Sequence, residues 1–182
     1  MSMPLDLSPA VDSLVTTLVV EDEDDLRESL TRFLTGLGHE VVTATTAKQA
    51  LDEIRRRKIA CVLLDVRLPD LSGVDLVPQL LGLEPHAAVL MITAVNDAHS
   101  AALCMQRGAM DYLVKPVDLA DLERAIARAL ARRREQVEQE QTQAWLKHEI
   151  VRRGAELRRE RTNLERISVA TLEALVNALE AK

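Results

Sequence analysis

Residues 62–76 read VLLDVRLPDLSGVDL, and this stretch decides the fold. It opens on a short aliphatic run that ends at a carboxylate, Asp65. Pro69 and Gly73 follow and mark a loop. A short aliphatic run bounded by polar and turn residues is typical of a strand buried on both faces. The stretch therefore predicts a central strand with a carboxylate at its carboxyl end.

The same pattern recurs along residues 14 to 117. Short aliphatic runs lie at 14–20, 40–43, 59–64, 89–93 and 112–114, and amphipathic helical stretches lie at 25–37, 46–58 and 100–107. Alternating strands and helices favour a parallel sheet with helices on both faces. The predicted fold is α/β, a doubly wound five-stranded parallel sheet of order 2-1-3-4-5, flavodoxin-like. We place this domain at residues 14–132 and a helical extension at 133–182.

The composition excludes several classes of protein. Hydrophobic residues make up 47% of the 182 residues, enough for a sizeable core, whereas aromatic residues make up 2%, too few for base-stacking platforms. The net charge of −6 makes nucleic acid an unlikely partner. Cys61 and Cys104 lie in apolar segments outside any metal-binding motif, which indicates reduced, buried thiols. Neither a membrane span nor a signal peptide is recognisable, so we expect a cytoplasmic protein without a membrane partner.

Chemically active side chains stand at the ends of four predicted strands. These are Glu21 and Asp22 after the first, Asp65 after the third, Thr93 after the fourth and Lys115 after the fifth. Open α/β sheets bind ligands where the carboxyl ends of their strands meet. Three carboxylates at close range need a cation, and oxygen ligands suit Mg²⁺. Asp65, on the central strand, is then the candidate nucleophile towards a phosphoryl donor, because the hydroxyl and the ammonium can neutralise the transferred group.

Four stretches carry a resemblance to a known family: LVVEDEDDLRESL (18–30), VLLDVRLPDLSGVDL (62–76), VLMITA (89–94) and GAMDYLVKP (108–116). Residues 15 to about 134 resemble the receiver domain of two-component response regulators. The resemblance implies that Asp65 accepts a phosphoryl group from a histidine kinase and that Lys115 pairs with this group. It further implies that Thr93 and Tyr112 act as the switch residues.

The resemblance also implies the Mg²⁺ ligands. They would be Glu21, Asp22, Asp65 and the backbone carbonyl of Arg67. Glu21 departs from the family pattern, since an aspartate is commoner there, and contact through a water molecule would tolerate the extra methylene. Pro78 is a second departure, and we expect it to kink or delay the third helix. A phosphatase of the haloacid-dehalogenase type would need an aspartate in place of Arg67, so the sequence argues against that alternative.

The extension at 133–182 follows a different pattern. It is rich in arginine and glutamate, and no proline follows Pro116. Apolar residues recur near every seventh position, at 130, 137, 144 and 151 and again at 150, 157 and 164. This spacing predicts a long helix with a coiled-coil-like seam, although Arg153 and Glu160 interrupt a second apolar row. We therefore expect a homodimer formed through the C-terminal helix.

The last residues, LERISVATLEALVNALEAK (164–182), resemble the opening helix of HD-GYP domains, which are cyclic di-GMP phosphodiesterases. The resemblance implies that the helix leads to such a domain beyond this chain. The chain itself contains none of that family's His/Asp metal motifs, so we expect a switch and not an enzyme. The alternative is a self-contained regulator that binds a partner protein through its switch face or its coiled coil.

Overall fold

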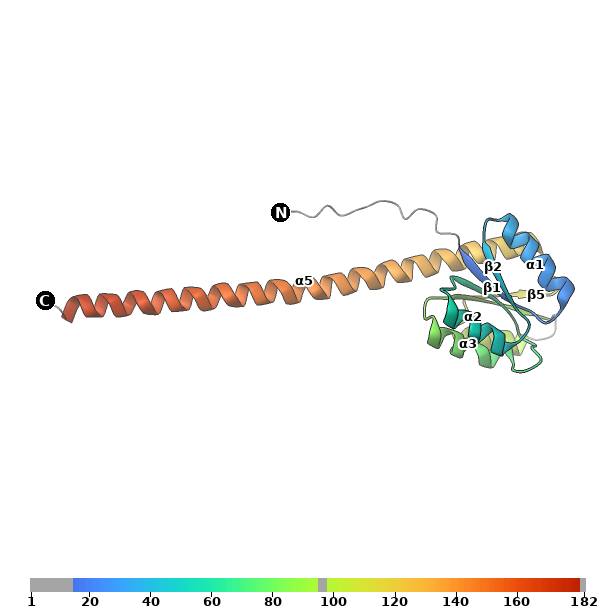
Figure 1. Cartoon of the computed structure of the whole chain (residues 1–182), viewed down its shortest axis with the longest axis horizontal. Helices are drawn as coiled ribbons and strands as arrows, with labels where there is room; N and C mark the ends of the chain where they lie inside the picture. The colour runs from blue at the N-terminus through green and yellow to red at the C-terminus, as the bar shows by residue number, and fades with distance from the viewer. Residues whose placement is uncertain (1–14, 95–97, 181–182) are drawn as a thin grey trace. The chain divides into compact units, whose positions relative to one another are not determined.

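A computed structural model describes residues 15–94 and 98–180 of the protein. Within these residues, strands and helices alternate from the first strand to the long last helix (Figure 1). They are β1 (Thr16–Val20), α1 (Asp24–Gly36), β2 (Glu40–Ala44), α2 (Ala47–Arg56), β3 (Cys61–Asp65), α3 (Gly73–Leu83), β4 (Ala88–Thr93), α4 (Ala98–Gln106), β5 (Asp111–Val114) and α5 (Leu119–Glu180). Leu14, predicted to begin the first strand, lies outside the described residues, as do residues 181 and 182 of the extension.

The predicted fold class is confirmed. The five strands form one parallel sheet of order β2-β1-β3-β4-β5. β3 lies at the centre, between β1 and β4, and each of its residues is buried. Gly38 and Gly108, which follow α1 and α4, have φ angles of 86° and 107°. Both glycines adopt the left-handed conformation that commonly ends a helix, as their positions in the sequence predict.

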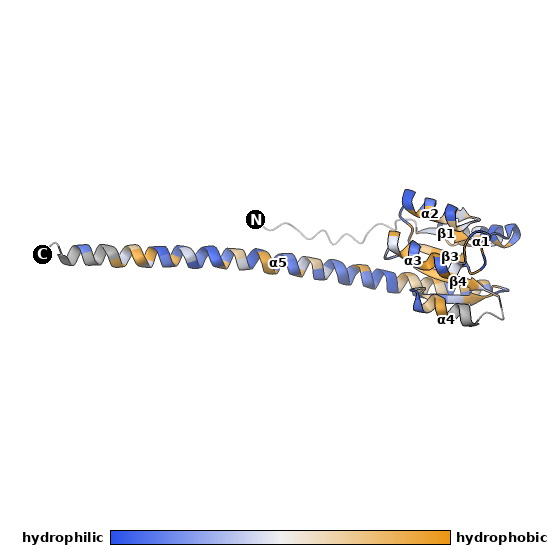
Figure 2. Cartoon of the chain, turned by 90° about the horizontal axis from the view of Figure 1, so that it is seen from below, coloured by the Kyte–Doolittle hydropathy of each residue, from blue (hydrophilic) through white to orange (hydrophobic). Residues whose placement is uncertain are grey.

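Helices cover both faces of the sheet because successive strand residues point to opposite sides. Leu18 and Val20 pack into a core shared with α2, α3 and α4. Val19 packs into a second core with α1 and the start of α5. Figure 2 shows the hydrophobic colours concentrated on the strands between these layers. Cys61 and Cys104 are both buried and reduced, as predicted.

Pro78 does not delay the third helix, which was one of the two effects that we expected of it. α3 begins at Gly73 and continues through Pro78 to Leu83. A proline has no amide hydrogen for the carbonyl four residues earlier, here that of Val74. The guanidinium of Arg107, just after α4, donates to the Val74 oxygen at 3.1 Å. The same side chain pairs with Asp75. The side chain of Arg107, which follows α4, thus replaces the hydrogen bond that the proline removes.

The first amides of α2 are satisfied by two side chains. Asp70, in the loop after β3, accepts from the amides of Ala47 and Lys48 at 2.9 and 3.0 Å. Thr46 accepts from the amide of Gln49 at 3.2 Å. Desolvation opposes ionisation of Asp70, but the backbone hydrogen bonds prevail and hold its pKa below the ordinary value. The loop that follows the central strand is therefore tied to the start of α2.

The last helix, α5, runs from Leu119 to Glu180. Asp118 starts it by accepting from the amides of Ala120 and Asp121 at 2.9 and 3.0 Å. Contacts divide the chain into two compact units after Gln136, whereas the sequence placed the boundary after residue 132. Among the described residues, no helix combines the length and apolar character needed to cross a bilayer.

Replacing Asp70 by alanine should lower the free energy of unfolding by about 1 kcal/mol at pH 7, because two helix amides lose their acceptor. The folded-state pKa of Asp70 is lowered, so its contribution is full above the unfolded pKa of about 4 and disappears as the pH falls through the folded pKa. Urea denaturation across this pH range measures the difference.

Asp52→Ala is the matched control, since Asp52 pairs only at the exposed surface, with Arg55. This change should cost less than about 0.5 kcal/mol. An equal cost for Asp70→Ala and Asp52→Ala would contradict the role assigned to Asp70.

Candidate phosphoacceptor site

The ends of β1 and β3 bring three carboxylates together. Val20 pairs with Leu64 across the two neighbouring strands, so Glu21 and Asp22 follow β1 beside Asp65, the last residue of β3. Carboxylate oxygens of the three residues lie within 4.8 Å of one another. In the described part of the chain, this is the only group of three or more acidic, histidine or cysteine ligands close enough to hold a metal ion. Oxygen-only ligands suit a hard divalent cation such as Mg²⁺.

The ammonium of Lys115 joins this cluster from the end of β5. Its Nζ lies 2.7 Å from Asp65 Oδ2 and 3.0 Å from Glu21 Oε1. Partial burial opposes its charge, but hydrogen bonds to Asp65 and Glu21 outweigh burial and raise the pKa of Lys115 above its ordinary value. Three ionised carboxylates and one ammonium would leave two negative charges, which a divalent cation would balance.

Glu21 is the most deeply buried of the three carboxylates. Its side chain has no solvent exposure. The longer side chain reaches Lys115, with Oε2 at 2.9 Å from Nζ but without hydrogen-bond geometry. Burial raises the pKa of Glu21 to about 7, Lys115 opposes this rise, and the charge of Asp65 adds to it. A buried carboxylate oxygen that lacks a hydrogen bond is a position where a cation or a donor would be favourable.

The remaining predicted residues lie around Asp65. Thr93 ends β4 and is buried, and its hydroxyl is 3.5 Å from the carbonyl of Ala94. The amide of Arg67 donates to Asp65 Oδ1 at 3.1 Å, which places this residue beside the carboxylate. Tyr112, on β5, is 47% exposed and so points away from the core. The structure therefore brings Asp65, Lys115 and the acidic pair into contact, and it leaves the tyrosine at the surface.

A close backbone approach holds the loop that carries Asp65. The amide of Gly73 donates to the carbonyl of Val66 at 2.8 Å. A Cβ atom at position 73 would lie 2.2 Å from the carbonyl oxygen of Asp65. Only glycine fits at this distance, and the sequence prediction that Gly73 shapes the loop gains a physical reason.

Sequence reasoning missed Arg27, a residue of α1. Its side chain is 18% exposed, and its guanidinium donates to the carbonyls of Glu21 and Asp22 at 3.0 and 3.3 Å. It also pairs with Asp24. Arg27 thus holds the backbone of both acidic residues. Its place one turn into a helix gave no signal of this contact, because the acceptors are carbonyl groups that sequence patterns do not reveal.

Comparison with known proteins now adds to this geometry. The family described as response regulator receiver domain matches residues 17–127. The chain belongs to this family. The acidic cluster and the lysine, at the carboxyl edge of the sheet, all lie within the matched segment.

Several relatives and solved structures resemble this receiver domain. The response regulator protein PilR of Pseudomonas aeruginosa is 38% identical over 122 residues, which cover 67% of this chain and 27% of PilR. Nodulation protein W of Bradyrhizobium diazoefficiens is 37% identical, with 71% and 57% of the two chains covered. The transcriptional regulatory protein ZraR of Escherichia coli K12 is 33% identical, with 64% and 26% covered. The chain spans about a quarter of the length of PilR and ZraR.

Two crystal structures show the same fold. A CheY-like receiver domain protein from Methanospirillum hungatei superimposes with a TM-score of 0.65 at 29% identity, covering 68% of this chain and 99% of that one. The receiver domain of an HD domain-containing protein from Pseudomonas fluorescens gives a TM-score of 0.67 at 25% identity, covering 70% and 95%. In both comparisons the receiver domain accounts for the matched share.

Gly73→Ala should destabilise the protein by at least about 2 kcal/mol, because the new methyl group would overlap the carbonyl of Asp65. Urea denaturation measures this loss. Gly36→Ala is the control, since nothing lies within 4 Å of a Cβ atom at that helical position. This second variant should keep or gain stability, and equal stabilities for both variants would refute the close approach.

Arg27→Met should weaken Mg²⁺ binding about tenfold, because the acidic pair loses hydrogen bonds worth about 1 kcal/mol each. Isothermal titration calorimetry with MgCl₂ measures the affinity. Arg32→Met removes the same charge from the same helix, where Arg32 is 72% exposed and contacts only Glu28 at 3.7 Å. Equal affinities of the two variants would show that charge, and not positioning, governs binding.

Proposed function

We propose that this protein is a signalling switch that accepts a phosphoryl group on Asp65 from a histidine kinase. The observation that carries this proposal is the contact of Asp65 Oδ2 with Lys115 Nζ at 2.7 Å, beside two further carboxylates. A carboxylate held in place by an ammonium can act as a nucleophile towards phosphorus. Membership of the receiver family supports the same role.

The chemistry is a phosphoryl transfer. An oxygen of Asp65 attacks the phosphorus of a phosphohistidine on the kinase. The phosphorus–nitrogen bond breaks, its electron pair returns to the imidazole, and an acyl phosphate forms on Asp65. Lys115 then follows the negative charge to the phosphoryl oxygens, and the hydroxyl of Thr93 donates to them.

A Mg²⁺ ion would be held by Asp22, Asp65 and the carbonyl of Arg67, with Glu21 as an outer ligand. When bound, it supplies positive charge to the phosphoryl oxygens. The all-oxygen donor set and the excess of three carboxyl groups over one ammonium favour this ion.

The negative charge of the phosphoryl group on Asp65 then changes the conformation of the switch residues. Thr93 moves towards the phosphoryl group, and Tyr112 turns inward from its exposed position. This changes the surface formed by α4, β5 and α5. The signal then passes along α5, through which two copies of the chain form a homodimer. We place the protein in the cytoplasm, where a kinase and ATP-derived phosphoryl groups are available.

We further propose that α5 leads to an HD-GYP phosphodiesterase domain and that the present chain is not itself an enzyme. The solved receiver domain that comes from an HD domain-containing protein supports this output. The relatives named as transcriptional regulators favour a second candidate, a DNA-binding output. His/Asp metal motifs in the reading frame after Lys182 would support the phosphodiesterase output, and a helix-turn-helix there would refute it.

A self-contained regulator is the third candidate, supported by the exposed apolar side chains of α5.

Asp65→Asn should abolish acyl-phosphate formation, because an amide cannot act as the nucleophile. The experiment treats the protein with acetyl phosphate and Mg²⁺ and measures, by intact-protein mass spectrometry, the gain of one phosphoryl group. Asp52→Asn, a change on the exposed face of α2, should label like the wild type. Mg²⁺-dependent labelling retained in Asp65→Asn would overturn the assignment.

A further inference from the structure

Apolar side chains line one edge of α5 in its C-terminal half. They are Leu146, Ile150, Leu157, Leu164 and Ile167, and their exposure lies between 47% and 71%. We call these five residues the α5 seam. Large aliphatic side chains repeated along one edge of a helix favour a partner, since each loses contact with water on association.

The seam follows a heptad. Its members are separated by four, seven, seven and three residues, which places Ile150, Leu157 and Leu164 at one core position of a coiled coil and Leu146 and Ile167 at the other. Of the seven core positions from 146 to 167, five are aliphatic, and the others are Arg153 and Glu160. The other heptad phase, which includes Ala144 and Val151, reaches Arg158 at its next step and offers no comparable run.

The flanking charges select the partner and its direction. Each core row is flanked by two further heptad positions. On one flank, position g, stand Glu149, Glu156 and Asn163, and on the other flank, position e, stand Lys147, Gly154, Arg161 and Ser168. One flank is thus acidic or neutral and the other is basic or neutral. Parallel helices bring opposite flanks together, whereas antiparallel helices bring each flank against its own kind. A second copy in parallel orientation therefore gains one pair of opposite charges, Glu156 with Arg161 of the partner subunit, and meets no like-charged pair along these flanks.

One pair carries this complementarity most directly. In a parallel pair, Glu156 lies opposite Arg161 of the partner subunit, five positions further on, and symmetry repeats the contact. In the single chain, Arg161 contacts only the exposed Glu165 at 2.9 Å. Such surface pairs contribute little and can be exchanged. The contact across the helix pair is thus available without loss of a buried interaction.

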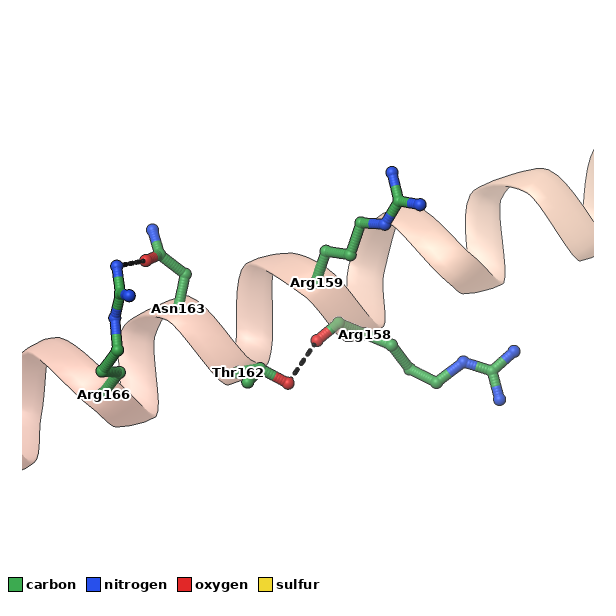
Figure 3. Close-up of a pocket in the computed structure, with 5 residues that line it drawn as sticks. All are labelled: Arg158, Arg159, Thr162, Asn163 and Arg166. Atoms are coloured by element: carbon green, nitrogen blue, oxygen red, sulfur yellow. Dashed lines mark hydrogen bonds between the residues drawn. The ribbon is translucent and has the colours of Figure 1, made fainter.

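The two charged core positions are compatible with this pairing. Arg153 is drawn to the flank by Glu149, at 2.7 Å on its own helix. Glu160 stands next to the flank that carries Arg161. The arginine-rich hollow lined by Arg158, Arg159, Thr162, Asn163 and Arg166 lies off the seam, and its basic side chains extend away from the helix (Figure 3). Four other exposed apolar residues, Trp145, Val151, Val169 and Leu172, also lie off the seam and form no heptad.

We infer that residues 146–167 of α5 pair with the same residues of a second copy as a parallel, in-register, two-stranded coiled coil. This rests on the proposed homodimer and specifies its interface. In register, all five seam residues meet their own counterparts. A shift of one heptad would match Arg153 with Glu160 of the partner subunit, but it would leave fewer fully apolar layers.

The test is disulfide trapping in the full-length chain. Ile150→Cys should form a covalent dimer on mild oxidation, seen on a non-reducing gel, because position 150 lies away from the centre of the seam and only in-register parallel helices bring two copies of it together. Arg159→Cys, on the outer face, is the control and should stay monomeric on the gel. Both variants keep the buried Cys61 and Cys104, so any background from these thiols is shared.

A charge swap gives an independent readout. Glu156→Lys should weaken the dimer at least several-fold in sedimentation equilibrium, and the double variant with Arg161→Glu should restore it. Trapping between Ile150→Cys and Leu157→Cys chains, without trapping of Ile150→Cys alone, would overturn the register while the homodimer stands. A strict monomer at micromolar concentration would overturn the homodimer itself, and labelling of Asp65 would remain a separate question.

Discussion

The ion pair between Lys115 and Asp65 is the interaction on which the site depends. Three carboxylates within 4.8 Å would repel one another, and the ammonium at 2.7 Å offsets part of this repulsion. The pair also joins β5 to β3, two strands that β4 separates in the sheet. A change in the charge of Asp65 would therefore act directly on Lys115, the residue that follows β5.

This arrangement gives the site a short covalent route to the long helix. Lys115 follows β5, and Asp118, three residues later, accepts the first amides of α5. The segment that contacts Asp65 is thus the segment that starts α5. On the other side of the pocket, Arg27 and Gly73 hold the two loops that supply the carboxylates. Hydrogen bonds and a close backbone contact thus hold the carboxylate loops, and the segment that carries Lys115 continues directly into α5.

Many of the strand bounds and several of the site residues could be predicted from local sequence patterns. Each described strand begins or ends within two residues of its aliphatic run, because a buried parallel strand requires such a run. Asp65, Glu21 and Lys115 could be predicted to meet because the strand ends of an open α/β sheet converge. The expected delay of α3 at Pro78 does not occur, and Arg107, a residue 33 positions from Val74, supplies the hydrogen bond that Val74 lacks. The contacts of Asp70 and Arg27 were not predicted for a similar reason, because their partners are backbone groups, which sequence patterns do not reveal.

The layers of the fold, the candidate phosphoacceptor and the heptad edge of α5 follow from the amino-acid sequence, since each depends on spacing along the chain. The complete burial of Glu21, its contact with Lys115 and the approach of Gly73 to the carbonyl of Asp65 become visible in the folded protein alone. Those facts depend on distances between segments far apart in sequence. Depth in a pocket and the closeness of two backbones are set by packing, which no single segment encodes.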